Sequence, residues 1–439
     1  MNKRMTLLWL LLGLGSDLQL VASLSITEVF VLLIAPFVFL HESAYMRKNG
    51  VLPLFLLSVC VILGCCVSSL ANNTPFPFFL RGMAVTVLVS CSVVVAHWVL
   101  RRDPSGFKWY ILAIPISSAL STFIFKSTVE VDMLGESAAE IMSGPTYWIK
   151  RLSPLFFAPI KGWYLKMPTA YNVCAPIFVA GFSLLTSISG RGSAVRSVCF
   201  AVLALFGGKK RYTMMRIPNY FGLFCLIGVF TVSSAYYVYK LSASKGWLGR
   251  EAQAKYEQQT DGGHGGIGRL ILGGRGDSFV GLLACRDKPI LGWGPWAIDE
   301  NDYTNEFLMR FGTAEDVDNI YRNKMIEASL GLRTKLLPCH SYITEFWAWY
   351  GIAGLVFWIY VVFIFLRYLK QDVIAVPQWY GWIACSVPAV FWGILFNPFA
   401  DRFGIPLLIV AALLTRAVRT GRQTLPNNMM KEIEEADRK

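Results

Sequence analysis

Long apolar runs recur along most of this chain, and each is long enough to cross a lipid bilayer as a helix. The runs extend over about 16 to 23 residues and are flanked by charged side chains. Lys3 and Arg4 make the first run similar to a signal peptide, but the apolar run that follows favours a retained span. We predict spans at 5–22, 24–40, 51–70, 82–100, 107–125, 168–189, 191–206, 217–239, 343–367, 379–396 and 403–418. The pattern predicts an all-α polytopic membrane protein.

Composition agrees with lipid as the main solvent. Of the 439 residues, 55% are hydrophobic and only 16% are charged, against about a quarter in soluble domains. The mean hydropathy is +0.49. The formal net charge of +13 is typical of cytoplasmic loops and lipid headgroup contacts in a membrane protein. We therefore expect membrane lipids as partners and no nucleic acid.

The positions of Lys and Arg near the span ends predict the sidedness of the chain, because basic residues are retained in the cytoplasm. Arg47, Arg101 and the basic residues at 209–216 are expected inside. With eleven spans the 207–216 loop falls outside, so one further crossing is expected between 126 and 167, near Lys150 and Arg151. We predict about twelve transmembrane helices with both termini in the cytoplasm.

This topology divides the chain into four parts. Residues 1–239 form an N-terminal transmembrane bundle, 240–342 one large outer loop, 343–418 the C-terminal transmembrane helices and 419–439 a cytoplasmic tail. The long polar loop is expected to carry the function, since a connector of this length is usually functional. Cys285 and Cys339 lie in it, and whether they form a disulfide is open. The chain has no CxxC pair, so we expect no zinc site of the usual kind. We also expect no cofactor and no other metal site.

Three side chains on the predicted outer side are candidates for chemistry. Arg191 lies between Gly190 and Gly192, Arg275 follows a glycine-rich stretch, and His340 directly precedes an aromatic span. Two guanidinium groups can hold a diphosphate through forked hydrogen bonds, and an imidazole can accept a proton from a sugar hydroxyl near neutral pH. The structural alternative is that these residues only contact headgroups at the membrane interface.

The region around Arg275 and His340 resembles the O-antigen ligase and polymerase superfamily. In that family an Arg precedes a P-x-x-G-x-G turn, and a later His opens a span that continues with G-x-x-G-L. This chain has Arg275, Pro289, Gly292 and Gly294, followed by His340, Gly351, Gly354 and Leu355. The stretch SGRGS at 189–193 is similar to the S-R-G element of the family. Ser341 departs from the family pattern, which has Asn after the His.

The resemblance implies a membrane glycosyltransferase of the C type (GT-C), with a helical bundle and a catalytic periplasmic loop. Such an enzyme transfers a glycan (O-antigen) from undecaprenyl diphosphate to a lipid A-core acceptor sugar at the periplasmic face of the bacterial inner membrane. By resemblance, His340, Arg275 and Arg191 are catalytic, and Arg191, Arg275, Gly292, Gly294 and Ser341 bind substrate. The implied mechanism is inverting and independent of metal.

Two alternatives remain open. A polymerase would instead extend the lipid-linked glycan, with a glycan as acceptor, and these residues do not separate it from a ligase. A transporter or flippase would place ionisable residues deep in several spans and would have two related halves. The spans as read are nearly free of charge, and this favours the enzyme.

Overall fold

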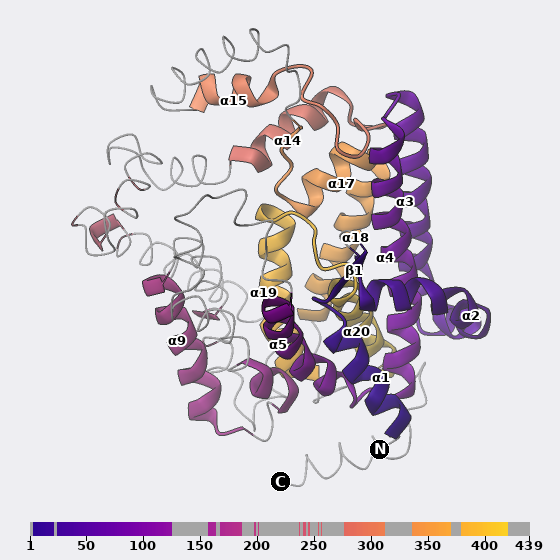
Figure 1. Cartoon of the computed structure of the whole chain (residues 1–439), viewed down its shortest axis with the longest axis vertical. Helices are drawn as coiled ribbons and strands as arrows, with labels where there is room; N and C mark the ends of the chain where they lie inside the picture. Colours follow the sequence, from indigo (N-terminus) through magenta and orange to yellow (C-terminus); the bar gives the residue numbers. More distant parts are fainter. Residues whose placement is uncertain are drawn as a thin grey trace.

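The computed structural model describes residues 3–21, 24–124, 157–163, 167–186, 197–198, 201, 237, 240–242, 245, 253, 256, 276–311, 336–369, 379–419. These residues are mostly helical, and the helices of the first and last thirds of the chain pack side by side (Figure 1). Helices α14, α15 and α17 gather at one end of this bundle.

Within 3–124, the described residues form five helices and one small hairpin. Strands β1 (Gln19–Val21) and β2 (Leu24–Ser25) pair antiparallel. The Ser25 hydroxyl and the Glu28 carboxylate form a capping box at the start of α2, which fixes that helix start. The helices are α1 (Lys3–Leu14), α2 (Ile26–Lys48), α3 (Leu52–Ala71), α4 (Phe76–Arg102) and α5 (Phe107–Ile124).

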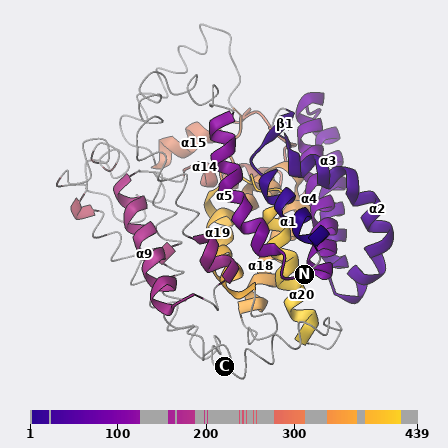
Figure 2. The same cartoon turned by 60° about the horizontal axis from the view of Figure 1, so that its bottom comes forward.

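The remaining described helices come from the middle and the end of the chain. Helix α9 (Thr169–Thr186) lies apart from the group formed by α1 to α4 (Figure 2). The predicted outer loop contributes α14 (Gly276–Asp287) and α15 (Tyr303–Phe311). The last third forms α17 (Tyr342–Tyr350), α18 (Ile352–Leu369), α19 (Tyr380–Phe396) and α20 (Gly404–Arg419).

Helix α4 forms the centre of the packed group. It contacts α2, α3 and α20, and most of its length is buried. Its inner residues are small or β-branched, with Val85, Val89, Val93 and Ala96 all almost inaccessible to solvent. Such side chains allow the neighbouring helices to approach closely, as is usual between helices in membranes.

Three described helices are long and apolar enough to cross a membrane: α2, α3 and α4. Shorter apolar helical stretches lie at 170–181, 352–367, 381–396 and 404–414. The structure therefore supports a helical membrane protein. The predicted spans at 191–206 and 217–239 lie outside the described residues except for 197–198, 201 and 237, and so does most of the predicted crossing at 126–167.

The predicted span at 5–22 is wrong in its second half. Helix α1 ends at Leu14, so at 1.5 Å per residue it is only ~18 Å long. Ser16 closes the helix end by donating a hydrogen bond to the Gly13 carbonyl, 2.8 Å away. The chain then enters the β1–β2 hairpin. The helix ends among residues that favour helix ends, namely Gly13, Gly15, Ser16 and Asp17. Their preference outweighs the hydropathy of the apolar run at 5–22.

The predicted span at 343–367 is divided into two helices. Gly351 has a positive φ of 64° and separates α17 from α18. This conformation is easily reached only by glycine. The helix that follows His340 is therefore a short element of its own at the end of the bundle.

Candidate active site

His340 pairs with a carboxylate that the sequence did not single out. The Nδ1 atom of His340 lies 2.8 Å from Oδ2 of Asp277, and both side chains are about half exposed. Asp277 is the second residue of α14, and His340 comes two residues before α17. Ser278, the next residue of α14, binds the backbone of the same histidine, because its hydroxyl donates to the His340 carbonyl at 3.0 Å. The imidazole is thus oriented by α14 and remains accessible to solvent.

Ser341 connects the residue after His340 to the protein interior. Its hydroxyl accepts the Thr344 N–H at 3.3 Å as the N-cap of α17. It also donates to the Ile394 carbonyl near the end of α19 at 2.7 Å. The side chain is only 1% exposed. The described contacts of Ser341 fix the start of α17 beside His340, and its predicted role in substrate binding stays a prediction.

Gly292 and Gly294 allow three backbone segments to meet. Both have positive φ, 72° and 84°. A Cβ on Gly292 would lie 2.7 Å from the Ala348 carbonyl and from the Gly351 amide nitrogen. The Gly292 carbonyl itself accepts a hydrogen bond from the Asn72 side chain at 3.0 Å. These two glycines, predicted to bind substrate, therefore pack the turn against α17 and against the α3–α4 connection.

Glu345 is a buried acid one turn into α17. Its side chain is 5% exposed, and its Oε2 accepts the Phe399 N–H at 2.9 Å. Phe399 belongs to the connection between α19 and α20, and its ring packs against the ring of Tyr342. Ser341 and Glu345 together attach the first turn of α17 to α19 and to the segment that follows it. The position of His340 therefore depends on the last two helices of the chain.

The loop between α14 and α15, beside the His340–Asp277 pair (the candidate pair), has its own group of hydrogen-bonded polar side chains. The carboxylate of Asp299 accepts the N–H groups of Tyr303 and Thr304 at 2.8 and 2.9 Å and so caps the start of α15. The Tyr303 hydroxyl donates to Asp287 at 2.6 Å. This hydrogen bond and the neighbouring Arg286 hold the pKa of Asp287 below its usual range. Burial is the main reason why the pKa of Tyr303 is raised to about 12.

The two loop cysteines do not form a disulfide in the structure. Cys285 and Cys339 are both free thiols and both buried. Burial raises the pKa of Cys285 to about 12 and that of Cys339 well above its usual value. In the described part of the chain, no group of three or more His, Cys, Asp or Glu residues is arranged to hold a metal ion.

The two predicted catalytic arginines are not covered by the structure. Arg191 and Arg275 both lie outside the described residues. Arg275 directly precedes Gly276, the first residue of α14, and is therefore two positions from Asp277 in the chain. Of the three predicted catalytic residues, the described structure thus places His340 alone.

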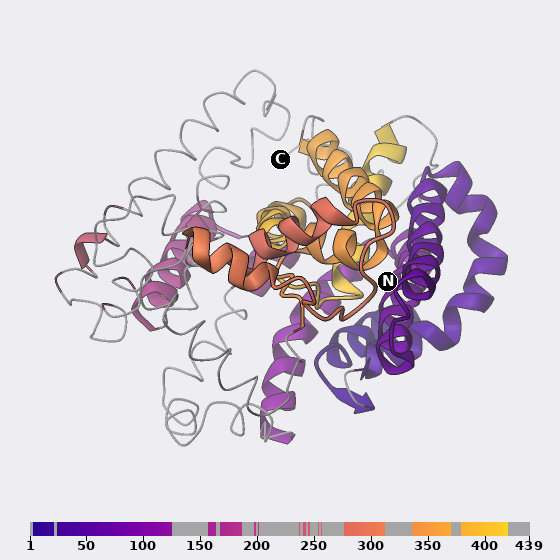
Figure 3. The ribbon, with the colours of Figure 1, turned by 90° about the horizontal axis from the view of Figure 1, so that it is seen from above.

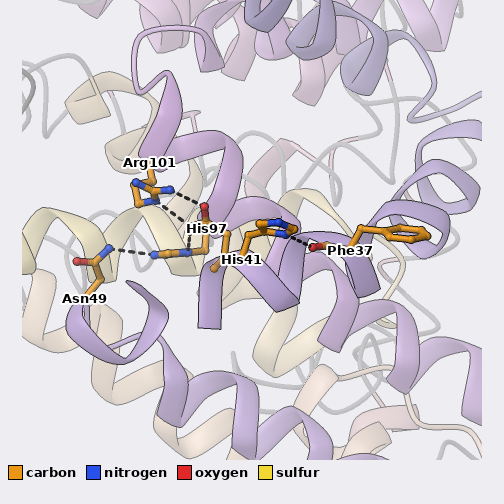
Figure 4. A network of polar contacts seen from close by, with 6 residues as sticks. Phe37, His41, Asn49, His97 and Arg101 are labelled. Atoms are coloured by element: carbon orange, nitrogen blue, oxygen red, sulfur yellow. Dashed lines mark hydrogen bonds and ion pairs between the residues drawn. The ribbon is translucent and has the colours of Figure 1, made fainter. Parts of the chain in front are cut away.

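A second buried polar cluster lies between α2 and α4 (Figure 4). The Arg101 guanidinium donates to both carboxylate oxygens of Glu42, at 2.8 and 2.5 Å. His97 is fully buried, with Nδ1 3.3 Å from the same carboxylate and Nε2 3.0 Å from the Asn49 amide nitrogen. Glu42 and Arg101 lie just beyond the predicted spans at 24–40 and 82–100, so the cluster does not contradict the expectation that those spans carry almost no charge. The helices α2 and α4 are longer than the predicted spans and include both residues. The apolar runs hid this cluster because its members are isolated in the sequence.

The cluster lies at the opposite end of α4 from the candidate pair. Asn72, just before α4, contacts the loop turn at Gly292, whereas Arg101 is in the last turn of α4. The 27 residues of α4 correspond to a helix length of ~40 Å. Arg101 and Glu42 are paired and hydrogen-bonded, as buried charges in membrane helices usually are. The cluster thus connects α2 to α4 and is distant from His340.

Comparisons with family models, with curated proteins and with solved structures find no match to this chain.

Proposed function

We propose that this chain is a membrane glycosyltransferase of the O-antigen ligase type. It transfers an undecaprenyl-diphosphate-linked glycan to a lipid A-core acceptor sugar at the periplasmic face of the inner membrane. The observation that supports this best is the His340–Asp277 pair, in which a half-exposed imidazole is held 2.8 Å from a carboxylate at one end of a helical bundle. A carboxylate partner orients an imidazole and stabilises its protonated form, as a general base requires.

The proposed reaction is one inverting displacement. The acceptor hydroxyl oxygen attacks the anomeric carbon of the donor glycan, and His340 takes the hydroxyl proton. The bond between the anomeric carbon and the diphosphate oxygen breaks, and the diphosphate leaves with the electron pair. In this proposal Arg191 and Arg275 stabilise the negative charge that develops on the diphosphate. The reaction needs no metal, because the guanidinium groups supply the positive charge.

Asp277 adds a residue to the mechanism that the sequence did not assign. Its Oδ2 contacts His340 Nδ1, so it orients the ring and favours the imidazolium that forms when the proton is accepted. It does not touch the reacting atoms, and it is therefore a positioning residue. Arg275 lies two residues before Asp277 in the chain, so the proposed diphosphate ligand is close in sequence to the partner of His340.

The surface glycolipids of a strain that lacks this gene provide the test. If the chain is a ligase, long polymer accumulates on the lipid carrier and none reaches the lipid A-core. If it is a polymerase, the core instead carries a single repeat unit. Unchanged glycolipids with normal polymer on the core would contradict both forms of the proposal. Transfer activity of the purified protein on a lipid-linked donor separates the enzyme from a transporter, which moves its substrate without breaking the glycosidic bond.

A further inference from the structure

Helix α18 carries an exposed apolar stripe along one face. Its members are spaced three or four residues apart, so they lie one above another on the helix surface. Each is between 41% and 53% exposed in the folded chain. The stripe consists of Ile352, Val356, Ile359, Phe363 and Leu366.

The neighbouring helix α3 carries a second stripe with the same spacing. Helices α3 and α18 are in direct contact, since a Cβ on Gly64 would lie 3.1 Å from the Ala353 Cβ. Leu70, at the loop end of α3, is the most exposed member at 80%. The members are Leu56, Cys60, Leu63, Val67 and Leu70. Exposed apolar faces of this length on two adjacent apolar helices are typical of surfaces in contact with lipid chains.

The turn after α14 continues the α18 stripe beyond the helix. Ile290 and Leu291 are 69% and 46% exposed. The Ile290 carbonyl accepts the Ile352 N–H at 2.9 Å, so Ile290 lies directly beyond the first residue of α18. Seen from this end of the molecule, the turn passes over the bundle close to α3 (Figure 3). Two large apolar side chains are thus exposed where the apolar face of the spans ends.

The length of α18 locates this turn relative to the bilayer. The helix has 18 residues and is therefore ~27 Å long, slightly less than the hydrocarbon core of about 30 Å. If α18 spans the bilayer, the hydrocarbon boundary lies at or just beyond Ile352. On this placement of α18, Ile290 and Leu291 lie near that boundary, because the Ile290 carbonyl bonds the first residue of the helix.

The polar groups around the turn match an interfacial position. The Lys288 ammonium lies 2.5 Å from the Asn72 side-chain oxygen and 3.8 Å from the centre of the Trp293 ring. The Trp347 indole N–H donates to the Pro289 carbonyl at 2.8 Å. Lysine and tryptophan are enriched at the level of the headgroups, where the polar end of each side chain contacts water and the apolar part contacts the membrane.

We propose that the segment 288–291 is an interfacial anchor, which inserts Ile290 and Leu291 into the headgroup–acyl boundary of the leaflet on the His340 side. The occupant of this surface is the lipid bilayer. The anchor holds the C-terminal end of α14 at headgroup depth, while Asp277 at the other end of the helix pairs with His340. The inference requires only that α3 and α18 cross a bilayer, and it does not depend on glycosyl transfer.

Depth-dependent fluorescence quenching tests the proposal. A fluorescent amino acid is incorporated at 290, 359 or 309 in the full chain, which is then reconstituted into phosphatidylcholine–phosphatidylglycerol nanodiscs. The lipids carry a nitroxide either near the headgroup or near the end of the acyl chain. Met309 is the matched control, because it is apolar and 50% exposed but lies on α15, beyond α14 at the end of the molecule (Figure 1).

The proposal predicts a distinct pattern for each position. The probe at 290 loses most of its emission with the shallow nitroxide and much less with the deep one. The probe at 359, in the middle of α18, responds most strongly to the deep nitroxide, and the probe at 309 responds to neither. An unquenched probe at 290 together with a quenched probe at 359 overturns the proposal. So does a photocrosslinker at 290 that joins two copies of the chain in place of lipid.

Discussion

At the scale of single residues, the orientation of His340 depends on contacts with residues that are distant in sequence. His340 is held by Asp277 through its side chain and by Ser278 through its carbonyl. Both partners are in the first turn of α14. A change at Asp277 is therefore expected to alter the orientation of the imidazole without removing it.

Replacing His340 by Ala removes the proposed base, and we expect transfer to fall by about 100-fold or more. Asp277→Asn keeps the size of the side chain and removes its charge, so we expect a clear but smaller loss. Asp287→Asn is the matched control, since Asp287 lies at the far end of α14 and bonds Tyr303. Transfer of a lipid-linked glycan by purified variants in equal amounts measures the effect. Full activity of His340→Ala would remove His340 from the mechanism.

The two loop thiols are expected to be unreactive in the folded protein. The thiolate is the reactive form of cysteine, and burial raises the pKa of Cys285 to about 12 and that of Cys339 well above its usual value. Maleimide should therefore leave both unmodified at neutral and mildly alkaline pH, and should modify both after denaturation. Peptide mass spectrometry measures the labelled fraction, with Asn73→Cys as the positive control, since Asn73 is exposed at the turn between α3 and α4. A Cys285–Cys339 disulfide in the isolated protein would contradict the free thiols.

At the scale of elements, the short helix α17 is fixed by contacts at both of its ends. Ser341 and Glu345 attach its start to α19 and to the Phe399 segment. Gly351 ends it, because the chain there adopts a positive φ beside the Ile290 carbonyl. The break between α17 and α18 is thus the place where the turn that contains Gly292 packs against the chain.

Gly351→Ala is expected to destabilise the protein by about 1 to 3 kcal/mol, because alanine at this φ is strained and its Cβ overlaps the Ile290 backbone. Gly181→Ala is the control, since a Cβ at this helical position meets nothing within 4 Å. The control should be neutral or stabilising by up to ~1 kcal/mol. Unfolding midpoints in mixed micelles compare the two variants. Equal midpoints would show that the Gly351 backbone is not constrained.

The Glu42–Arg101 pair is expected to stabilise the contact between α2 and α4. Glu42→Gln removes the charge that Arg101 and His97 face, and breaking such a buried pair costs about 3 kcal/mol or more. Glu306→Gln in the exposed Glu306–Arg310 pair on α15 should cost no more than ~1 kcal/mol. The free energy of unfolding in mixed micelles measures both. A change at Glu42 no larger than that at Glu306 would show that the cluster contributes little to stability.

At the scale of the whole molecule, the structure groups the turn before α4 with the predicted outer loop. Asn72 donates to the Gly292 carbonyl and accepts from Lys288. Arg102 is at the other end of α4. The positive-inside rule predicts Arg101 inside and the 240–342 loop outside, and this sidedness stays a prediction.

Labelling from one side of the membrane is expected to follow this grouping. An impermeant maleimide added outside should modify Asn73→Cys and should reach Arg102→Cys only after the membrane is opened. Both parent residues are exposed. The chain without either substitution supplies the background from its own cysteines. Labelling of both positions from the same side would contradict α4 as a span.

The sequence predicted most helices of the first and last thirds, because long apolar runs leave few alternatives to a membrane helix. It misplaced the end of α1 and missed the break at Gly351, since hydropathy does not report helix-ending residues or the approach of a distant carbonyl. Resemblance pointed to His340, whose partner is described. It did not indicate Asp277, because a pairing between α14 and the start of α17 depends on how these helices pack. The buried Glu42 and His97 were missed for the same reason.

The contact of Asn72 with Lys288 and Gly292 joins positions 216 and 220 residues apart. The segment 276–311 is therefore not an interchangeable module. Consider a chimera that receives residues 276–311 from another protein. Without a compatible 72–75 turn, it would lose the hydrogen bonds that Asn72 makes with this segment. In laboratory evolution, changes at Asn72 and in this segment should appear together.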